Sequence, residues 1–316
     1  MTQRISQWVG LSVLLMAGVA CDKPVPARSN DTVPPPLPPP VASDSVVAVA
    51  ESPWDSTAGP VFLSMGSNAT IASIVFPSLA ADADVAASQL NVSPYRGKLF
   101  ELLGNGRVVG GATLTSIVPP DIPEDCTGWP LVQLSGVGAD TASRLWTIAF
   151  EQGRVVPVAF DSIAGLPSRD SSRLAMDLAR VASAAPGDTV AELRGIPYQV
   201  RRAYRFAIAP GVEGVVAEVQ RTLNQEANPK QEHLLLVAER DSASRGRFEV
   251  AYSERSAGGE EMLESSEVLT IVRFGATGDV GAFVARYVGD GVIYSLLQRT
   301  GARRWRLRWS SPYTGC

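Results

Sequence analysis

The sequence predicts an all-β protein built from antiparallel four-stranded meanders, with one connecting amphipathic helix. Three observations predict this class. From Gly97 onward, short segments of alternating apolar and polar residues are separated by Gly, Asn, Asp and Pro, which is typical of strands joined by tight turns. A pattern of four such segments occurs twice in the second half of the chain. Only the segment 168–184 shows apolar residues at helical spacing.

The first 21 residues have the composition of an export signal. Arg4 is their single positive side chain, an apolar stretch runs from Trp8 to Ala20, and Cys21 follows directly after small residues. That stretch is shorter than the about 20 residues that a membrane-spanning helix needs. We therefore expect residues 1–20 to be a signal peptide.

The residues 15–20 (LMAGVA) together with Cys21 resemble the lipobox of bacterial lipoproteins. The resemblance implies that Cys21 becomes the first residue of the mature chain and carries a diacylglyceryl thioether, usually with an amide-linked acyl chain such as palmitate. Two or more buried acyl chains make membrane attachment stable. It also implies a place in the cell envelope, facing the periplasm or the cell exterior. Gly18 stands where the family prefers an aliphatic residue, so an ordinary secreted protein is the alternative.

Residues 21–59 are expected to form a tether. Prolines dominate its first half, and the run Pro34–Pro40 predicts a stiff polyproline II segment rising about 3.1 Å per residue. The remainder, up to about Pro60, is predicted to be flexible. Such a tether would hold the folded part away from the membrane.

The charge of the chain excludes one class of partner. The formal net charge is −4 and the isoelectric point is about 5.2, which provides no positive field for nucleic acid. We therefore expect partners other than nucleic acid.

Residues 60–165 are expected to form an N-terminal β lobe. Its clearest hairpin joins strands at 98–103 and 107–115 through Gly104-Asn105-Gly106, because Asn-Gly is the preferred pair of a type I′ turn. Further strands are predicted at the following segments: 131–134, 144–150 and 155–160.

A connecting region, residues 166–195, contains the one predicted helix, from Ser168 to Ala184. Ser168 or Asp170 can cap its start, and Pro186-Gly187 ends it. Its apolar face is formed by Leu174, Leu178 and Val181. We expect this face to pack on a sheet.

Residues 196–316 are expected to form a C-terminal β lobe of two four-stranded copies, about 198–253 and about 268–310. Arg205-Phe206 and the glycines after it match Arg273-Phe274 and the glycines after it, and the segment 247–253 matches 304–310. The four-stranded copies, and the Gly-Asp-x-Gly turn at Gly278–Gly281 in the second of them, resemble FG-GAP-like propeller repeats, which implies propeller blades. A two-lobed β-sandwich or barrel is the alternative packing.

Two cysteines, Cys126 and Cys316, remain besides Cys21. Outside the cytoplasm such a leftover pair normally oxidises. We therefore predict a Cys126–Cys316 disulfide that ties the end of the chain to its first half.

Few residues could carry chemistry, and no pattern indicates a catalytic site, a cofactor or a metal site. His233 is the only histidine, and we expect it at the start of an apolar strand near solvent rather than as a catalytic base. An acidic cluster between the two copies lacks the spacing of a calcium loop, and we expect a solvated linker there. Its members are Glu260, Glu261, Glu264 and Glu267.

The last predicted strand has two distinct faces. Trp305, Leu307 and Trp309 alternate with a row of arginines, so the aromatic side should face the core. The arginines are expected to pair with Glu249 or Glu254 on a neighbouring strand, and the alternative is that they bind an acidic partner, a glycan or lipid head groups. These candidate partner-binding residues are Arg304, Arg306 and Arg308.

The sequence therefore favours a membrane-tethered module that binds or scaffolds a protein partner in the cell envelope, for instance as an accessory subunit of a membrane complex. The alternative is a glycan hydrolase that uses two carboxylates, since an Asp or Glu pair can suffice for that reaction.

Overall fold

The structure, a computed structural model, describes residues 54, 58–66, 68–79, 81, 87–119, 126–187, 190–223, 229–241, 246–259 and 264–316. These residues belong to one compact unit, Val49–Cys316. The expected signal peptide, Cys21 and most of the expected tether lie outside the described residues. Among the described helices, none has both the length and the apolar composition to cross a membrane.

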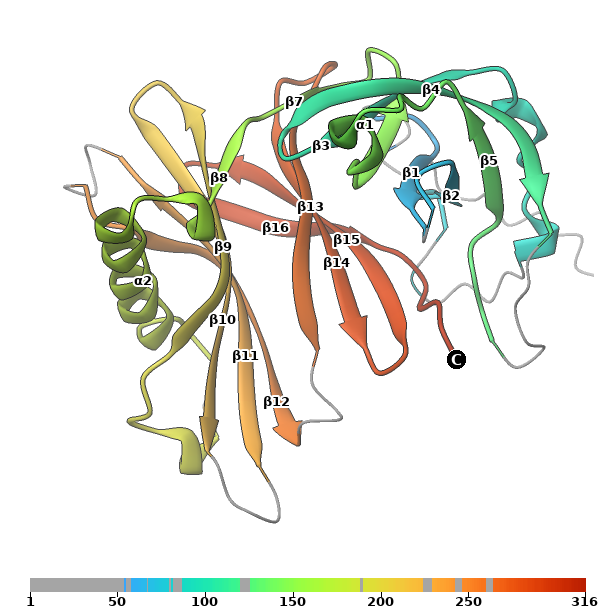
Figure 1. The fold of residues 1–316 in the computed structure, drawn as a ribbon. Helices are drawn as coiled ribbons and strands as arrows, with labels where there is room; N and C mark the ends of the chain where they lie inside the picture. Colours follow the sequence, from blue (N-terminus) through green and yellow to red (C-terminus); the bar gives the residue numbers. More distant parts are fainter. Residues whose placement is uncertain are drawn as a thin grey trace, which may run out of the picture. The chain divides into compact units, whose positions relative to one another are not determined.

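The predicted all-β class with one substantial helix is confirmed (Figure 1). The first part of the described chain forms a closed antiparallel barrel in the order β1-β2-β5-β4-β3-β6. Its strands are β1 (Phe62–Met65), β2 (Ile71–Val75), β3 (Leu99–Gly104), β4 (Arg107–Val118), β5 (Leu131–Ser135) and β6 (Ile148–Glu151). Short helices lie between them: η1 (Ala87–Gln89), η2 (Ser93–Tyr95) and α1 (Thr141–Arg144).

The hairpin between β3 and β4 forms where Asn-Gly predicted it. Asn105 and Gly106 have φ values of 52° and 70°, so both central residues adopt the left-handed conformation that a type I′ turn requires. Gly106 is also needed for space, since a Cβ there would lie 2.7 Å from the carbonyl oxygen of Val158.

Two five-stranded antiparallel sheets follow the barrel. Sheet I has the order β12-β11-β10-β9-β8, and sheet II the order β16-β15-β14-β13-β7. Sheet I comprises β8 (Phe160–Ser162), β9 (Gln199–Ala209), β10 (Val212–Leu223), β11 (Lys230–Arg240) and β12 (Glu249–Gly259). Sheet II comprises β7 (Val155–Pro157), β13 (Ser265–Phe274), β14 (Val280–Val288), β15 (Gly291–Gly301) and β16 (Arg304–Ser310).

Each predicted four-stranded copy is therefore one sheet with a short strand added at its edge. The matching glycines have a shared physical reason: a Cβ on Gly214 would lie 2.6 Å from the ring of Phe206, and one on Gly281 would lie 2.8 Å from the ring of Phe274. In both copies a phenylalanine in the last part of one strand covers a glycine of the next strand. This packing explains why the same residues recur.

The two sheets pack face to face as a β-sandwich, one of the packings that the sequence left open. One hydrophobic cluster joins apolar residues of both sheets, among them Val216, Val237, Ile271 and Leu297. Glu239 of β11 is 1% exposed, and its side chain bonds across this layer to sheet II. Its carboxylate accepts hydrogen bonds from Arg299, the Trp305 indole and the backbone N–H of Arg303.

The other face of each sheet is also covered. Helix α2 (Ser168–Ser183) packs Leu174, Leu178 and Val181 on sheet I, as its apolar face predicted (Figure 1). The connecting region also contains η3 (Ile163–Gly165) and η4 (Ala191–Leu193). Sheet II shares a hydrophobic core with the barrel, which includes Phe274, Phe283 and Trp309.

The predicted strands at 144–150 and 155–160 differ from those observed. Arg144 ends helix α1, and the strand begins only at Ile148. The segment 155–160 divides between β7 and β8, which belong to different sheets. The chain crosses from sheet II to sheet I here, where Val158 donates a backbone hydrogen bond to Ile271. Residues 60–165 therefore do not form a lobe independent of 196–316.

The expected tether also ends earlier than residue 59. Trp54 and Ala58 are 1% and 0% exposed and belong to the core shared by the barrel and sheet II. The Trp54 ring lies 4.8 Å from that of Phe283 and 5.5 Å from that of Trp309, measured between ring centroids. The Pro and Ser residues around Trp54 predicted an exposed tether, but the large apolar ring of Trp54 favours burial in the core.

The predicted disulfide between Cys126 and Cys316 is confirmed, with a Cα–Cα distance of 4.4 Å. Beside it, Thr127 and Gly315 exchange two backbone hydrogen bonds of 2.9 Å. Thr314 is bonded in the same way to Val292 of β15. The end of the chain thus fastens the segment before β5 to sheet II.

Candidate functional site

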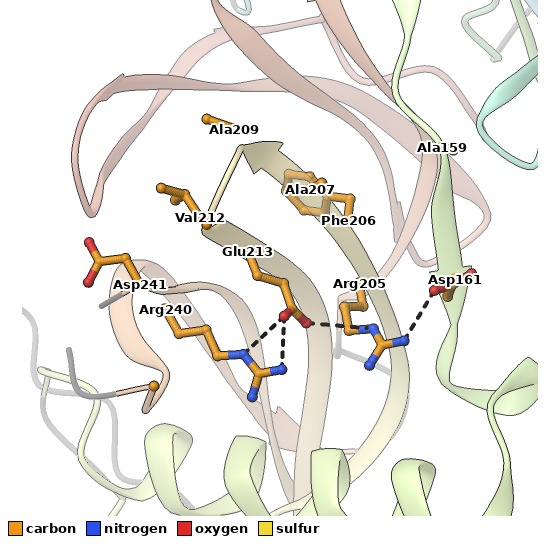
Figure 2. Close-up of a pocket in the computed structure, with 12 residues that line it drawn as sticks. Ala159, Asp161, Arg205, Phe206, Ala207, Ala209, Val212, Glu213, Arg240 and Asp241 are labelled. Carbon is orange, nitrogen blue, oxygen red and sulfur yellow. Dashed lines mark hydrogen bonds and ion pairs between the residues drawn. The ribbon is translucent and has the colours of Figure 1, made fainter. Parts of the chain in front are cut away.

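The outer face of sheet I carries a large cavity beside the region that α2 covers. At the N-terminal end of the helix lies a cavity of about 780 Å³, which we call the mixed-charge pocket (Figure 2). Its lining comes from β8 and the residue before it, from the β9–β10 hairpin, from the end of β11 and from residues between β11 and β12. The lining residues are Ala159, Asp161, Arg205, Phe206, Ala207, Ala209, Gly211, Val212, Glu213, Arg240, Asp241 and Gly246.

Strand register places four charged side chains of this pocket in a row. Asp161 lies opposite Arg205, and Glu213 lies opposite Arg240. Arg205 donates to Asp161 at 3.2 Å, and Arg240 donates to Glu213 at 3.0 and 2.8 Å. Arg205 also lies 3.6 Å from Glu213, which joins the two pairs into one ladder across four strands (Figure 2).

Apolar groups surround this charge ladder. Phe206, Ala207 and Val212 line the pocket beside it, and the guanidinium of Arg240 lies 4.5 Å from the ring centroid of Phe248. Arg205, Glu213 and Arg240 keep about 30% of their side chains exposed. A ligand can therefore reach these charged groups from solvent.

The chemistry of the mixed-charge pocket suits binding. Its described lining contains no Ser, Cys, Thr or His, so a nucleophile–base pair of the serine or cysteine hydrolase type is absent from it. It offers donors, acceptors and apolar surface side by side. These are the features of a recognition site for a ligand with apolar parts and groups of both charges.

His233 lies deeper in its strand than predicted. It is the fourth residue of β11, its side chain is 13% exposed, and it faces the interior of the sandwich. Its Nδ1 is 3.2 Å from the Glu218 carboxylate, and Nε2 is 3.4 Å from the Gln231 side chain. Both contacts hold the imidazole between polar side chains of β10 and β11.

Carboxylates also gather around His233, but they leave little space. Glu254 and Glu264 both pair with Arg286, and the cavity beside them is about 10 Å³, enough for a water but not for a sugar ring. Burial raises the pKa of Glu264. Burial opposes ionisation of Glu254 too, yet hydrogen bonds from Arg286 and Tyr252 outweigh it and lower the pKa of Glu254.

The predicted acidic linker is only partly described. Glu260 and Glu261 lie outside the described residues, whereas Glu264 pairs with Arg286 and Glu267 accepts a hydrogen bond from Tyr287. The described stretches of the chain hold no group of three or more His, Cys, Asp or Glu side chains suited to a metal ion.

The two faces predicted for the last strand are not what the structure shows. A β-bulge in β16 leaves Arg308 without a partner on β15, which shifts the alternation between Leu307 and Trp309. Trp305 consequently packs between the two sheets, and Trp309 packs on the opposite face, toward the barrel. Leu307 is 39% exposed. The prediction of one aromatic face was therefore wrong.

The predicted pairing of the three arginines with Glu249 or Glu254 is also wrong. Glu249 instead accepts from Arg303, at 2.7 Å, and Glu254 pairs with Arg286. Arg304, Arg306 and Arg308 form no ion pair with the described residues. Arg306 and Arg308 line a hollow of about 420 Å³ next to Trp54, so their role in binding stays a prediction.

The mixed-charge pocket was missed by the sequence reasoning. The four charged residues of its ladder each occupy a single position in a different strand, and only the register between strands brings them together. The Asp161 pairing could not be foreseen, because the segment 155–160 was assigned to one strand. The matched copies did place Arg205 and Glu213 near the same turn.

The chain matches no protein-family model, and comparison with curated proteins and with solved structures finds no match either.

Proposed function

We propose that this chain is a lipid-anchored protein of the bacterial cell envelope that binds a protein partner through the mixed-charge pocket. The observation that carries the proposal is the pocket itself: a cavity of about 780 Å³ lined by a ladder of two arginines and two carboxylates, by a third carboxylate, Asp241, and by apolar side chains. A protein segment carries both charges and apolar groups, so it complements this lining better than an acyl chain or a polyanion does.

The anchor follows from the lipobox-like residues before Cys21. Replacing Cys21 with Ser removes the thiol that accepts the lipid, so the protein should move from the membrane fraction to the soluble fraction. Fractionation of cells that express the Cys21→Ser variant measures this directly. A variant that still sediments fully with membranes would contradict the anchor, and the partner proposal would then be judged on its own experiment.

The partner is tested by site-specific cross-linking in the native cell. A photo-reactive residue at Ala209, on the exposed rim of the pocket, should yield a discrete cross-linked protein identified by mass spectrometry. The same residue at Met176, which is 69% exposed on α2, serves as the control position. It should not yield that product.

A filled pocket makes the test specific. Ala207→Trp places an indole in the cavity without changing a charge, so the cross-link from Ala209 should disappear. Met176→Trp adds the same ring outside the pocket and should leave the cross-link unchanged. Equal cross-linking from both positions, or a cross-link that survives Ala207→Trp, would rule out the pocket as the partner site.

A further inference from the structure

A second cavity lies on the same face of sheet I, at the C-terminal end of α2. This cavity, which we call the arginine pocket, has a volume of about 410 Å³. Its lining comes from the end of α2, the turn after η4, and strands β10 and β12. The described lining residues are Ala182, Ser183, Gly187, Arg194, Gly195, Ile196, Pro197, Tyr198, Arg221 and Arg255.

Behind this lining is a buried carboxylate that two arginines share. Glu232 is 0% exposed and accepts hydrogen bonds from Tyr198 at 2.9 Å, from Arg255 at 2.7 Å and from Arg221. The side chain of Arg221 is 7% exposed, and its guanidinium lies 4.6 Å from the ring centroid of Tyr198. Glu232 thus fixes both guanidinium groups in place but does not itself line the cavity.

The charge that the arginine pocket presents is therefore positive. Three guanidinium groups line it, and its described lining includes no carboxylate. Arg194 is exposed on the turn after η4 and forms no ion pair with the described chain. Guanidinium groups bind phosphate oxygens through paired N–H donors, and a phosphate offers more acceptor oxygens and more charge than a carboxylate.

We propose that the arginine pocket binds the phosphate group of a small phosphorylated molecule, supplied either as a soluble compound or as a phospholipid head group. Arg221 and Arg255 form the preorganised part of this site, since Glu232 and Tyr198 hold them before the ligand arrives. Arg194 completes it from the turn after η4. Ile196 and Pro197 provide apolar surface for the organic part of the ligand.

Calorimetric titration of the purified full chain tests the site with three probes at constant ionic strength: inorganic phosphate, glycerol phosphate and a short-chain phosphatidylglycerol below its micelle concentration. At least one should bind saturably. Binding of the first two identifies a soluble phosphate as the ligand class, and binding of the lipid alone identifies a head group. Either result supports the proposal, and saturable binding of none of them would overturn it.

A charge-reversal pair shows whether the binding uses this pocket. Arg194→Glu should weaken binding of the active probe more than about tenfold, because it replaces a charge-assisted contact with repulsion. Arg201→Glu makes the same charge change at an exposed position of β9 outside the pocket and should leave affinity within about twofold. Equal losses in the two variants would mean that only the net charge matters, and the site would be rejected. Both side chains are exposed, so both variants should fold, which thermal melting confirms.

Discussion

The two pockets at the ends of α2 share a sheet face and a helix but present different charges. In the mixed-charge pocket the carboxylates of Asp161 and Glu213 lie in the lining, level with their arginines. In the arginine pocket the corresponding carboxylate, Glu232, lies fully buried behind them. A pocket therefore presents both charges when the carboxylates lie in its lining beside the arginines. It presents only positive charge when the carboxylate is buried behind them.

The largest expected effect comes from removing the buried carboxylate. Glu232→Gln keeps the side-chain size but leaves Arg221 and Arg255 without their shared charge partner, so the free energy of unfolding should fall by about 3–5 kcal/mol. Glu213→Gln, at a partly exposed position of the other pocket, should cost less than about 1 kcal/mol. Urea titrations measure both, and similar losses would refute the distinction between the pockets.

The same carboxylate makes a testable contribution to acid stability. Burial opposes its ionisation, but hydrogen bonds from Arg255, Tyr198 and Arg221 outweigh burial and lower the pKa of Glu232 below the ordinary 4.5. Its stabilisation is therefore complete above pH 4.5 and is lost as the pH falls through the lowered value. The difference in unfolding free energy between wild type and Glu232→Gln should shrink between pH 6 and pH 3. A constant difference would contradict this assignment.

Removing the disulfide should lower stability without changing either pocket, because neither cysteine lines one. Replacing Cys126 and Cys316 with Ser removes a cross-link outside both pockets and should lower the free energy of unfolding by about 2–4 kcal/mol. Phosphate affinity and cross-linking from Ala209 should stay unchanged in the folded variant. Loss of either would mean that a pocket depends on how the barrel is fastened to sheet II.

A smaller effect is expected within the mixed-charge pocket. Arg240→Gln removes the ion pair with Glu213 and the contact over Phe248, at a combined cost of about 1 kcal/mol, because both contacts are partly exposed. Arg201→Gln is the matched control and should change stability by less than about 0.5 kcal/mol. Chemical denaturation resolves the two, and an equal effect would show that the ladder adds no stability.

Much of the fold could be predicted from patterns of residues close together in the sequence. The Asn105-Gly106 turn, the apolar face of α2 and the two matched copies each depend on residues close together in the chain, so their strands and hairpins could be predicted. The Cys126–Cys316 pair followed from counting, because only two cysteines remained after Cys21.

The features that the sequence did not predict depend on contacts between residues far apart in the chain. The bulge at Arg308 reverses the faces of β16 through its pairing with β15, and nothing in the alternation of that strand signals it. The burial of Trp54 depends on Phe283 and Trp309, more than 200 residues later in the sequence. Both pockets likewise exist only through inter-strand register, so composition and spacing alone could not reveal them.

The position of Trp54 has a consequence for the order in which the protein assembles. Its ring packs between phenylalanines of the barrel and a tryptophan seven residues before the end of the chain. The core shared by the barrel and sheet II is therefore incomplete until β16 has been synthesised and has packed. Contacts of such long sequence separation slow folding. Before β16 packs, the aromatic surface that Trp309 covers is exposed, and a chaperone would protect it most in that period.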